Sequence, residues 1–191
     1  MSLAKPGLAS RLAIDVMENQ ELTADVTQTK TIRMVLLVFI DKENRILIGE
    51  CANGHNPCFG MLIEPGGKRE EGESSVDAAL REGPQETNLT PDTSAMSSAG
   101  QLTVRFTTGK IFRIEVFTVR NWFGILRASS SPEFKSLNFL GVNEIPWEKA
   151  PEGDEQMIRD ILDGYKLDYT IWCGDSRKNV LCIKPTRYKP K

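Results

Sequence analysis

The sequence has no marked excess of either charge, no long hydrophobic run and only one histidine. Its 191 residues contain 24 lysines and arginines and 26 acids, which gives a formal net charge of −2. Proteins that bind a nucleic-acid polymer usually present a basic surface, so this balance argues against such a partner. No apolar stretch reaches the length that a membrane span needs, and the N-terminus lacks the pattern of a secretory signal. We therefore expect a cytoplasmic protein with no nucleic-acid polymer and no membrane among its partners.

Signatures of several other classes of site are also absent. The sequence has no G-x4-G-K-[S/T] phosphate loop, no serine elbow and no internal repeat. Cys51, His55 and Cys58 have the spacing of half a zinc site, but Cys173 and Cys182 lie far along the chain and do not supply a matching half. We interpret residues 51–58 as an ordinary loop with reduced thiols. His55 is expected on its surface, or at most in contact with a substrate.

Apolar patterns predict a mixed sheet flanked by helices, which is an α/β fold. The predicted strands are residues 31–40, 45–51, 61–64, 101–106, 110–119, 125–127, 137–140, 165–173 and 180–183. The predicted helices follow Ser74 and span residues 153–162. The strand at 31–40 is apolar on both faces and should lie centrally in the sheet. Residues 90–99 are polar and predict a loop.

The length suggests one main domain with shorter segments at both ends. We place an N-terminal extension at residues 1–30, the main domain at 31–184 and a basic C-terminal tail at 185–191. The tail is interpreted as solvated. The extension could pack on the domain, stay mobile or help to build a dimer, so both a monomer and a homodimer remain open.

Residues 66–89 are the most informative stretch. The run Pro65-Gly66-Gly67 indicates a loop, and Ser74 with Asp77 three residues later suits the start of a helix. Val76, Ala79 and Leu80 recur at helical spacing and predict its buried stripe.

The other face of this helix carries Glu82, Gln85 and Glu86. Offsets of three and four residues place these side chains next to one another. Clustered carboxylates repel each other, and Mg²⁺ takes oxygen ligands, usually one or two carboxylates together with substrate phosphates. The spacing therefore predicts a site that holds a divalent cation against a diphosphate.

This stretch resembles the Nudix box, G-x5-E-x7-R-E-U-x-E-E-x-G-U, in which U is a bulky aliphatic residue. The residues that fall on the pattern in register are Gly67, Glu73, Arg81, Glu82, Glu86 and Leu89. The resemblance to the Nudix hydrolases implies an α/β/α sandwich with a mixed sheet and a loop–helix catalytic box. It also implies a small-molecule nucleotide as substrate and Mg²⁺ as cofactor, with Mn²⁺ as an alternative.

Three positions depart from the pattern. Gly83 replaces an aliphatic residue, Gln85 replaces the first of the paired glutamates, and Asn88 replaces a glycine. Gln85 keeps an oxygen ligand but loses a charge, so the metal should bind more weakly. Pro84 stands at a free position, but proline inside a helix costs about 3 kcal/mol or more, and a kink there would separate the two acids of the site.

Other segments are similar to the Nudix branch that hydrolyses oxidised purine nucleoside triphosphates. The similar segments are residues 99–106, 131–134, 144–151 and 163–165. In that branch an acid in a late loop approaches the metal, and Glu133 stands at the matching place. The alternative interpretation of Glu133 is a solvated loop acid.

The substrate pocket of that branch is not fully reproduced. Its members carry an asparagine before the glycine pair, where this chain has residues 62–64, Leu-Ile-Glu. They also carry a tryptophan and two acids around a proline. Here Glu152 and Asp154 could replace those acids, and Trp147 or Trp122 could replace the tryptophan, although both tryptophans also suit the core or its rim.

The resemblance implies a set of roles. The metal ligands would be Glu82, Glu86, Gln85 and the carbonyl of Gly67; the catalytic residues would be Glu82 or Glu133 as base and Arg81 as the residue that orients the glutamates. Lys68 and Arg69 could contact phosphates or could simply be solvated charges.

The predicted reaction releases a monophosphate and pyrophosphate from a nucleoside triphosphate. Two alternatives stay open. One is a hydrolase of ADP-ribose or nucleotide sugars, and the other is a non-catalytic nucleotide-binding Nudix domain.

Overall fold

The computed structural model describes residues 30–127 and 132–190. The extension predicted at residues 1–30 therefore lies, except for Lys30, outside the described part. The division of the chain into three segments stays a prediction.

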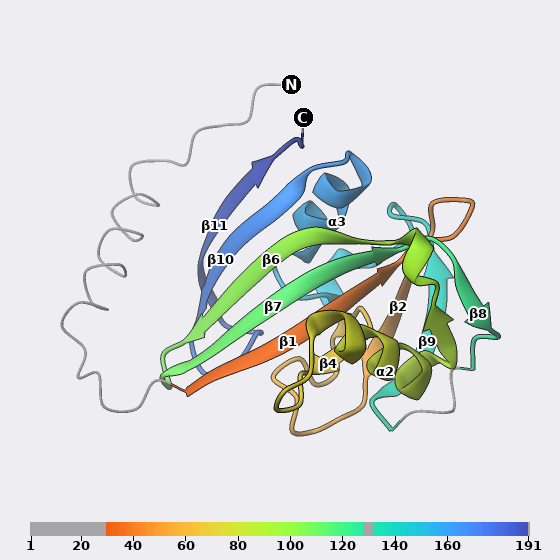
Figure 1. Cartoon of the computed structure of the whole chain (residues 1–191). Coiled ribbons are helices and arrows are strands. Elements are labelled where there is room, and N and C mark those ends of the chain that lie inside the picture. The colour runs from red at the N-terminus through yellow and green to blue at the C-terminus, as the bar shows by residue number, and fades with distance from the viewer. Residues whose placement is uncertain (1–29, 128–131, 191) are drawn as a thin grey trace.

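The largest layer is a six-stranded mixed sheet (Figure 1). In spatial order its strands are β11 (Val180–Tyr188), β10 (Lys166–Cys173), β6 (Met96–Phe106), β7 (Lys110–Val119), β1 (Lys30–Phe39) and β4 (Gly66–Lys68). The pairs β1–β7 and β10–β6 are parallel, and the other pairs are antiparallel.

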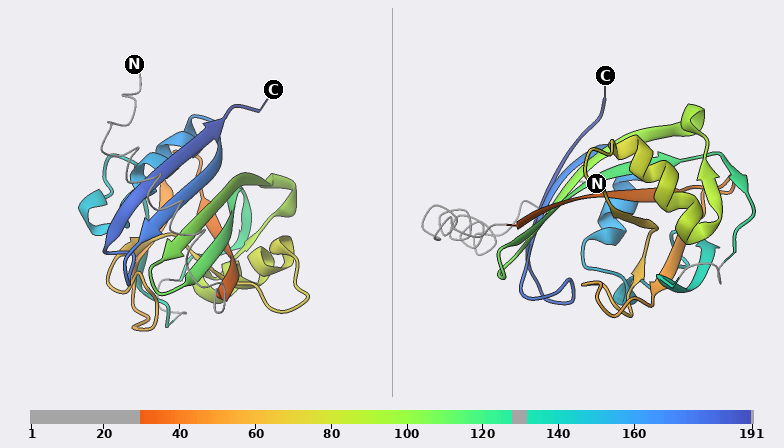
Figure 2. Two further views of the ribbon diagram at one scale, coloured as in Figure 1. Left: turned by 90° about the vertical axis from the view of Figure 1, so that its left-hand side faces the viewer. Right: turned by 60° about the horizontal axis from the view of Figure 1, so that its bottom comes forward.

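Two smaller sheets and two helices complete the described fold. The smaller sheets are β3 (Leu62–Ile63), β2 (Ile46–Cys51) and β9 (Phe134–Leu140), and β5 (Leu89–Pro91) with β8 (Trp122–Gly124). The α-helices are α2 (Ser75–Thr87) and α3 (Asp154–Leu162), and the short 3₁₀ helices are Thr93–Ala95 and Trp147–Lys149. Figure 2 shows the large sheet curving over α3. The α/β/α sandwich with a mixed sheet is confirmed.

Strand β1 separates two hydrophobic cores, as its apolar sequence predicts. Val35, Leu37 and Phe39 pack with the α2 residues Ala78 and Ala79. On the opposite face, the side chain of Val38 packs in the cluster that includes Met157 and Ile158 of α3. Successive side chains of a strand point to opposite faces, so this one strand ties both helices to the sheet.

Two expectations about the elements were wrong, and a third was incomplete. Residues 90–99 are not simply a loop, because they contain the end of β5, a 3₁₀ helix and the start of β6, where Met96 pairs with Val119. The short strand predicted at 125–127 lies at 122–124 instead. The tail expected after residue 184 continues β11 up to Tyr188, which pairs with Lys166, although its side chains there are mostly exposed, as expected of a solvated segment. In each case pairing with a distant strand decides the structure.

Helix α2 begins and ends where the sequence predicts. The Ser74 hydroxyl accepts a hydrogen bond from the backbone N–H of Asp77 at 3.1 Å. Asn88 ends the helix in the left-handed conformation with φ 63°. The helix continues through Pro84 to Thr87. The predicted buried stripe of this helix was partly wrong, because the Val76 side chain is 40% exposed.

The buried face of α2 consists of small and polar residues instead: Ala78, Ala79, Gly83, Glu86 and Thr87. Gly83 is needed there, because a Cβ atom would lie 2.9 Å from both the Leu89 carbonyl oxygen and Pro91 Cδ. The aliphatic residue of the Nudix pattern is thus replaced by glycine where β5 crosses close to the helix.

Within the described residues, no helix is long and apolar enough to cross a membrane.

Candidate active site

The glycine pair lets the loop before α2 approach both β1 and the helix. Gly66 and Gly67 pair with Leu36 and Val35 of β1. Gly66 has φ 154°, and a Cβ atom there would collide with the Val35 carbonyl. A Cβ atom on Gly67 would collide with the carboxylate of Glu82. The two glycines therefore bring backbone polar groups directly against an acid of the box.

Arg81 connects the loop to the helix through several hydrogen bonds. Its Nε and Nη2 donate to the two carboxylate oxygens of Glu73 at 2.8 and 2.9 Å. Its Nη1 donates to Glu82 at 2.8 Å and to Gln85 at 3.3 Å, and Nη2 also donates to the Lys68 carbonyl at 2.9 Å. The hydrogen bonds from Arg81 lower the pKa of Glu73 to about 2. The predicted Arg81–Glu73 ion pair is confirmed.

Glu86 lies on the buried side of α2 rather than on an open polar face. Its side chain is 5% exposed, and Oε2 accepts a hydrogen bond from the Gly66 N–H at 2.7 Å. Burial, together with the negative charges of Glu82 and Glu133, raises the pKa of Glu86 to about 8. A carboxylate in this position gains from a nearby cation.

Glu133 belongs to the same group of acids. The side-chain amide of Asn53 donates to its two carboxylate oxygens at 2.9 and 3.0 Å. The backbone N–H of Ala52 also donates to the Glu133 carbonyl at 2.7 Å. No local sequence pattern points to Asn53, because its partner lies 80 residues away along the chain.

These acids open onto a cavity of about 580 Å³ between the box and the large sheet. The residues from the box and nearby loops that line it include Asn53, His55, Asn56, Gly66, Gly67, Lys68, Glu82, Gln85, Glu86 and Glu133. The apolar lining residues include Ile32, Leu102, Val104, Phe112, Ile114 and Met157. A cavity with one apolar wall and a few convergent polar groups is the usual form of a small-molecule site.

A second polar group lines the same cavity away from the box. Asp154 and Arg177 form a buried ion pair, with Oδ1 and Nη2 2.9 Å apart. Glu64 and Cys58 also line the cavity. Burial raises the pKa of the Cys58 thiol to about 12, so it is neutral. Sequence reasoning identified Asp154 but missed Arg177, which reaches the cavity from the segment between β10 and β11.

Three of the residues expected to bind substrate do not line this cavity. Glu152 is exposed, and only its carbonyl approaches the group, by accepting from Arg177 at 3.4 Å. Trp147 packs against the core, and its indole N–H donates to the Val142 carbonyl at 2.9 Å. Arg69 donates to the Glu73 carbonyl.

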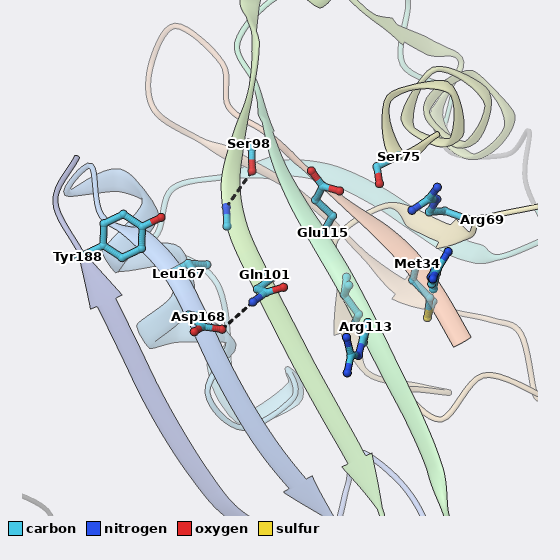
Figure 3. A pocket seen from close by; sticks show the side chains of 13 residues that line it. Met34, Arg69, Ser75, Ser98, Gln101, Arg113, Glu115, Leu167, Asp168 and Tyr188 are labelled. Atoms are coloured by element: carbon cyan, nitrogen blue, oxygen red, sulfur yellow. Dashed lines mark hydrogen bonds between the residues drawn. The ribbon is translucent and has the colours of Figure 1, made fainter. Parts of the chain in front are cut away.

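Arg69 lines a different hollow, which Figure 3 shows. This hollow has a volume of about 500 Å³ and also contains Arg33, Arg113 and Asp168. Gln101 donates to Asp168 at 2.9 Å there. None of the acids of the box lines this hollow, whereas Glu82 and Glu86 both line the first cavity.

The residues present suit a divalent cation that shares its coordination with a substrate. Among residues 30–127 and 132–190, no three His, Cys, Asp or Glu side chains are already arranged to hold a metal ion. Mg²⁺ needs only one or two carboxylates when phosphates and water supply the other ligands. The buried Glu86 carboxyl and the adjacent Glu82 meet that requirement.

Comparisons with known proteins agree with this geometry. A family model described as the NUDIX domain matches residues 30–161. An ADP-ribose pyrophosphatase from Methanocaldococcus jannaschii is 31% identical over 123 residues, which cover 64% of this chain and 69% of that protein. A MutT protein structure from Bacillus halodurans has a TM-score of 0.66 at 21% identity, and the match covers 81% of this chain and 97% of the other. A MutT protein structure from Methanosarcina mazei has a TM-score of 0.60 at 20% identity, and the match covers 71% of this chain and 96% of the other.

Proposed function

Because this chain belongs to the NUDIX domain family and is a Nudix hydrolase, we propose that it hydrolyses a nucleoside triphosphate to a monophosphate and pyrophosphate. The observation that carries the proposal is the convergence of Glu82, Glu86 and Glu133 on one cavity. The cavity has room for the phosphates beside these acids and for a base against the apolar wall.

The residues of the box would divide the work among them. Glu82 and Glu86 would hold Mg²⁺ or Mn²⁺, with Gln85 and the Gly67 carbonyl as further oxygen ligands. When bound, the metal neutralises phosphate charge and activates water for in-line displacement. Arg81 positions Glu82 through its 2.8 Å hydrogen bond. Glu133, which Asn53 holds in place, or Glu82 accepts the proton of the attacking water.

Lys68 lines the cavity and would contact a phosphate. Asp154 lines the same cavity away from the box and remains a substrate-binding proposal. The geometry gives no such support to Glu152, Trp147 or Arg69.

A second candidate is the hydrolysis of ADP-ribose, because the Methanocaldococcus jannaschii relative is an ADP-ribose pyrophosphatase. Product analysis separates the two reactions. Nucleoside triphosphates, ADP-ribose and nucleotide sugars are incubated with the full chain, with and without Mg²⁺. Release of pyrophosphate from a triphosphate supports the proposal. If only ADP-ribose is cleaved, giving two monophosphate products, the second candidate is favoured.

A further inference from the structure

One buried acid in the cavity has no place in this mechanism. Glu64 is 2% exposed, and its Oε1 atom has no hydrogen-bond partner among the described residues. Buried polar atoms in native proteins are nearly always paired, because an unpaired one loses its hydration without compensation. Since Glu64 lines the cavity, a bound ligand can supply the partner.

The charges around Glu64 favour its neutral form. Arg177 provides one positive charge for two buried carboxyl groups, and it is already paired with Asp154 at 2.9 Å. Burial first, and then the negative charge of Asp154, raise the pKa of Glu64 to about 8. The titratable groups around it are Asp154 on α3, Arg177 between β10 and β11, and Cys58 between β2 and β3. At neutral pH the Glu64 carboxyl therefore offers an O–H donor.

The apolar lining of the cavity suits a flat ring. Leu102 and Val104 of β6 and Phe112 and Ile114 of β7 line one side of the cavity, and Met157 of α3 lines it as well. The box with Glu82 and Glu86 lines another part of the same cavity. A nucleotide can thus place its phosphates at the box and its base against the apolar strands.

We propose that Glu64 selects the substrate by donating a hydrogen bond from its carboxylic acid to a carbonyl oxygen on the buried edge of the base. With the proton on Oε1, the oxygen that has no partner, a base that presents an amino group there, as adenine does, would place two donors against each other. The inference rests on the proposed function and adds its substrate class: nucleotides of oxo bases such as guanine, in preference to adenine nucleotides. It therefore also disfavours ADP-ribose.

The test is calorimetric binding of GTP and ATP to the full chain in the presence of a chelator, so that no turnover occurs. At pH 7 the wild-type protein should bind GTP at least about tenfold more tightly than ATP. Glu64→Leu should weaken GTP binding by roughly 10- to 100-fold and leave ATP nearly unchanged. Glu64→Gln keeps a neutral N–H donor and should retain GTP binding. Equal losses for both nucleotides, or no loss in Glu64→Leu, would overturn the assignment.

The pH dependence gives an independent arm that does not need the leucine variant to fold. Affinity of the wild type for GTP should fall as pH rises through about 8, where Glu64 loses its donor proton. The fall that Glu64 causes should be absent in Glu64→Gln. Any pH dependence that remains in this variant measures the contribution of guanine ionisation. Parallel pH profiles of the two proteins would refute the role of Glu64.

These readouts are separate from hydrolysis. Failure of turnover with intact Glu64-dependent binding would refute the proposed reaction alone. Turnover that is indifferent to Glu64 would refute the inference alone.

Discussion

At the residue scale, Arg81 is the side chain that joins the two halves of the box. It bonds Glu73 on the loop through two nitrogens and Glu82 on the helix through a third. Lysine keeps the charge but cannot reproduce this planar fork. We expect Arg81→Lys to lower kcat roughly 10- to 100-fold, because a small displacement of the acids impairs catalysis.

Steady-state kinetics and circular dichroism check this expectation. Arg159→Lys is the matched control, since Arg159 forms an i,i+4 surface pair with Glu155 on α3. The control should keep wild-type activity. Full activity of Arg81→Lys would show that the fork does not position Glu82.

Glu64 also links stability to pH. Its pKa is raised from 4.5 to about 8 in the folded chain, so between these values the native state holds a proton that the unfolded state has released. The free energy of unfolding should therefore fall with rising pH in this window, by at most about 1.4 kcal/mol per unit. Glu64→Gln should flatten that part of the profile. Urea unfolding from pH 5 to 8 measures it, and identical slopes for both proteins would contradict the assignment.

At the element scale, α2 departs from the usual rule for glycine in helices. Replacing a helical glycine by alanine normally stabilises by about 1 kcal/mol. At Gly83 the added methyl would lie 2.9 Å from Pro91 Cδ and from the Leu89 carbonyl. We expect Gly83→Ala to destabilise the protein by about 1–3 kcal/mol through overpacking.

Thermal or urea unfolding of Gly83→Ala gives the sign directly. Pro91→Ala removes the ring atoms against the new methyl, so the double variant should recover part of the loss. If Gly83→Ala were more stable than the wild type, β5 would not pack too closely against the helix to admit a methyl group.

The same elements show what a sequence can predict. The ends of α2 were predictable, because Ser74 and Asn88 act on neighbouring backbone groups. The start of β6 and the end of β11 were not, because their polar residues are strands only through pairing with β7 and β10. Local patterns report local chemistry, whereas pairing partners come from the whole fold.

At the scale of the whole molecule, the sheet arrangement brings together residues that no local pattern connects. The box acids came from a spaced motif, but Asn53 reaches Glu133 across 80 residues, and Arg177 reaches Asp154 across 23. Glu64 stands beside the box in the sequence, but the charged groups that act on its pKa, Asp154 of α3 and Arg177 before β11, come from distant segments. The acids of the box were therefore predictable from the sequence, and the buried polar groups elsewhere in the cavity were not.

We propose that Glu86 and its neighbours form a metal-dependent hydrolytic site. The most direct measurement is pyrophosphate release from nucleoside triphosphates by the wild type and by Glu86→Gln, each with and without Mg²⁺. Glu71→Gln, which changes an exposed acid of the same loop, is the control. We expect Mg²⁺-dependent turnover in the wild type and the control, and at least a roughly 100-fold loss in a folded Glu86→Gln protein. Full activity of Glu86→Gln, or turnover that does not need a divalent cation, would contradict the account.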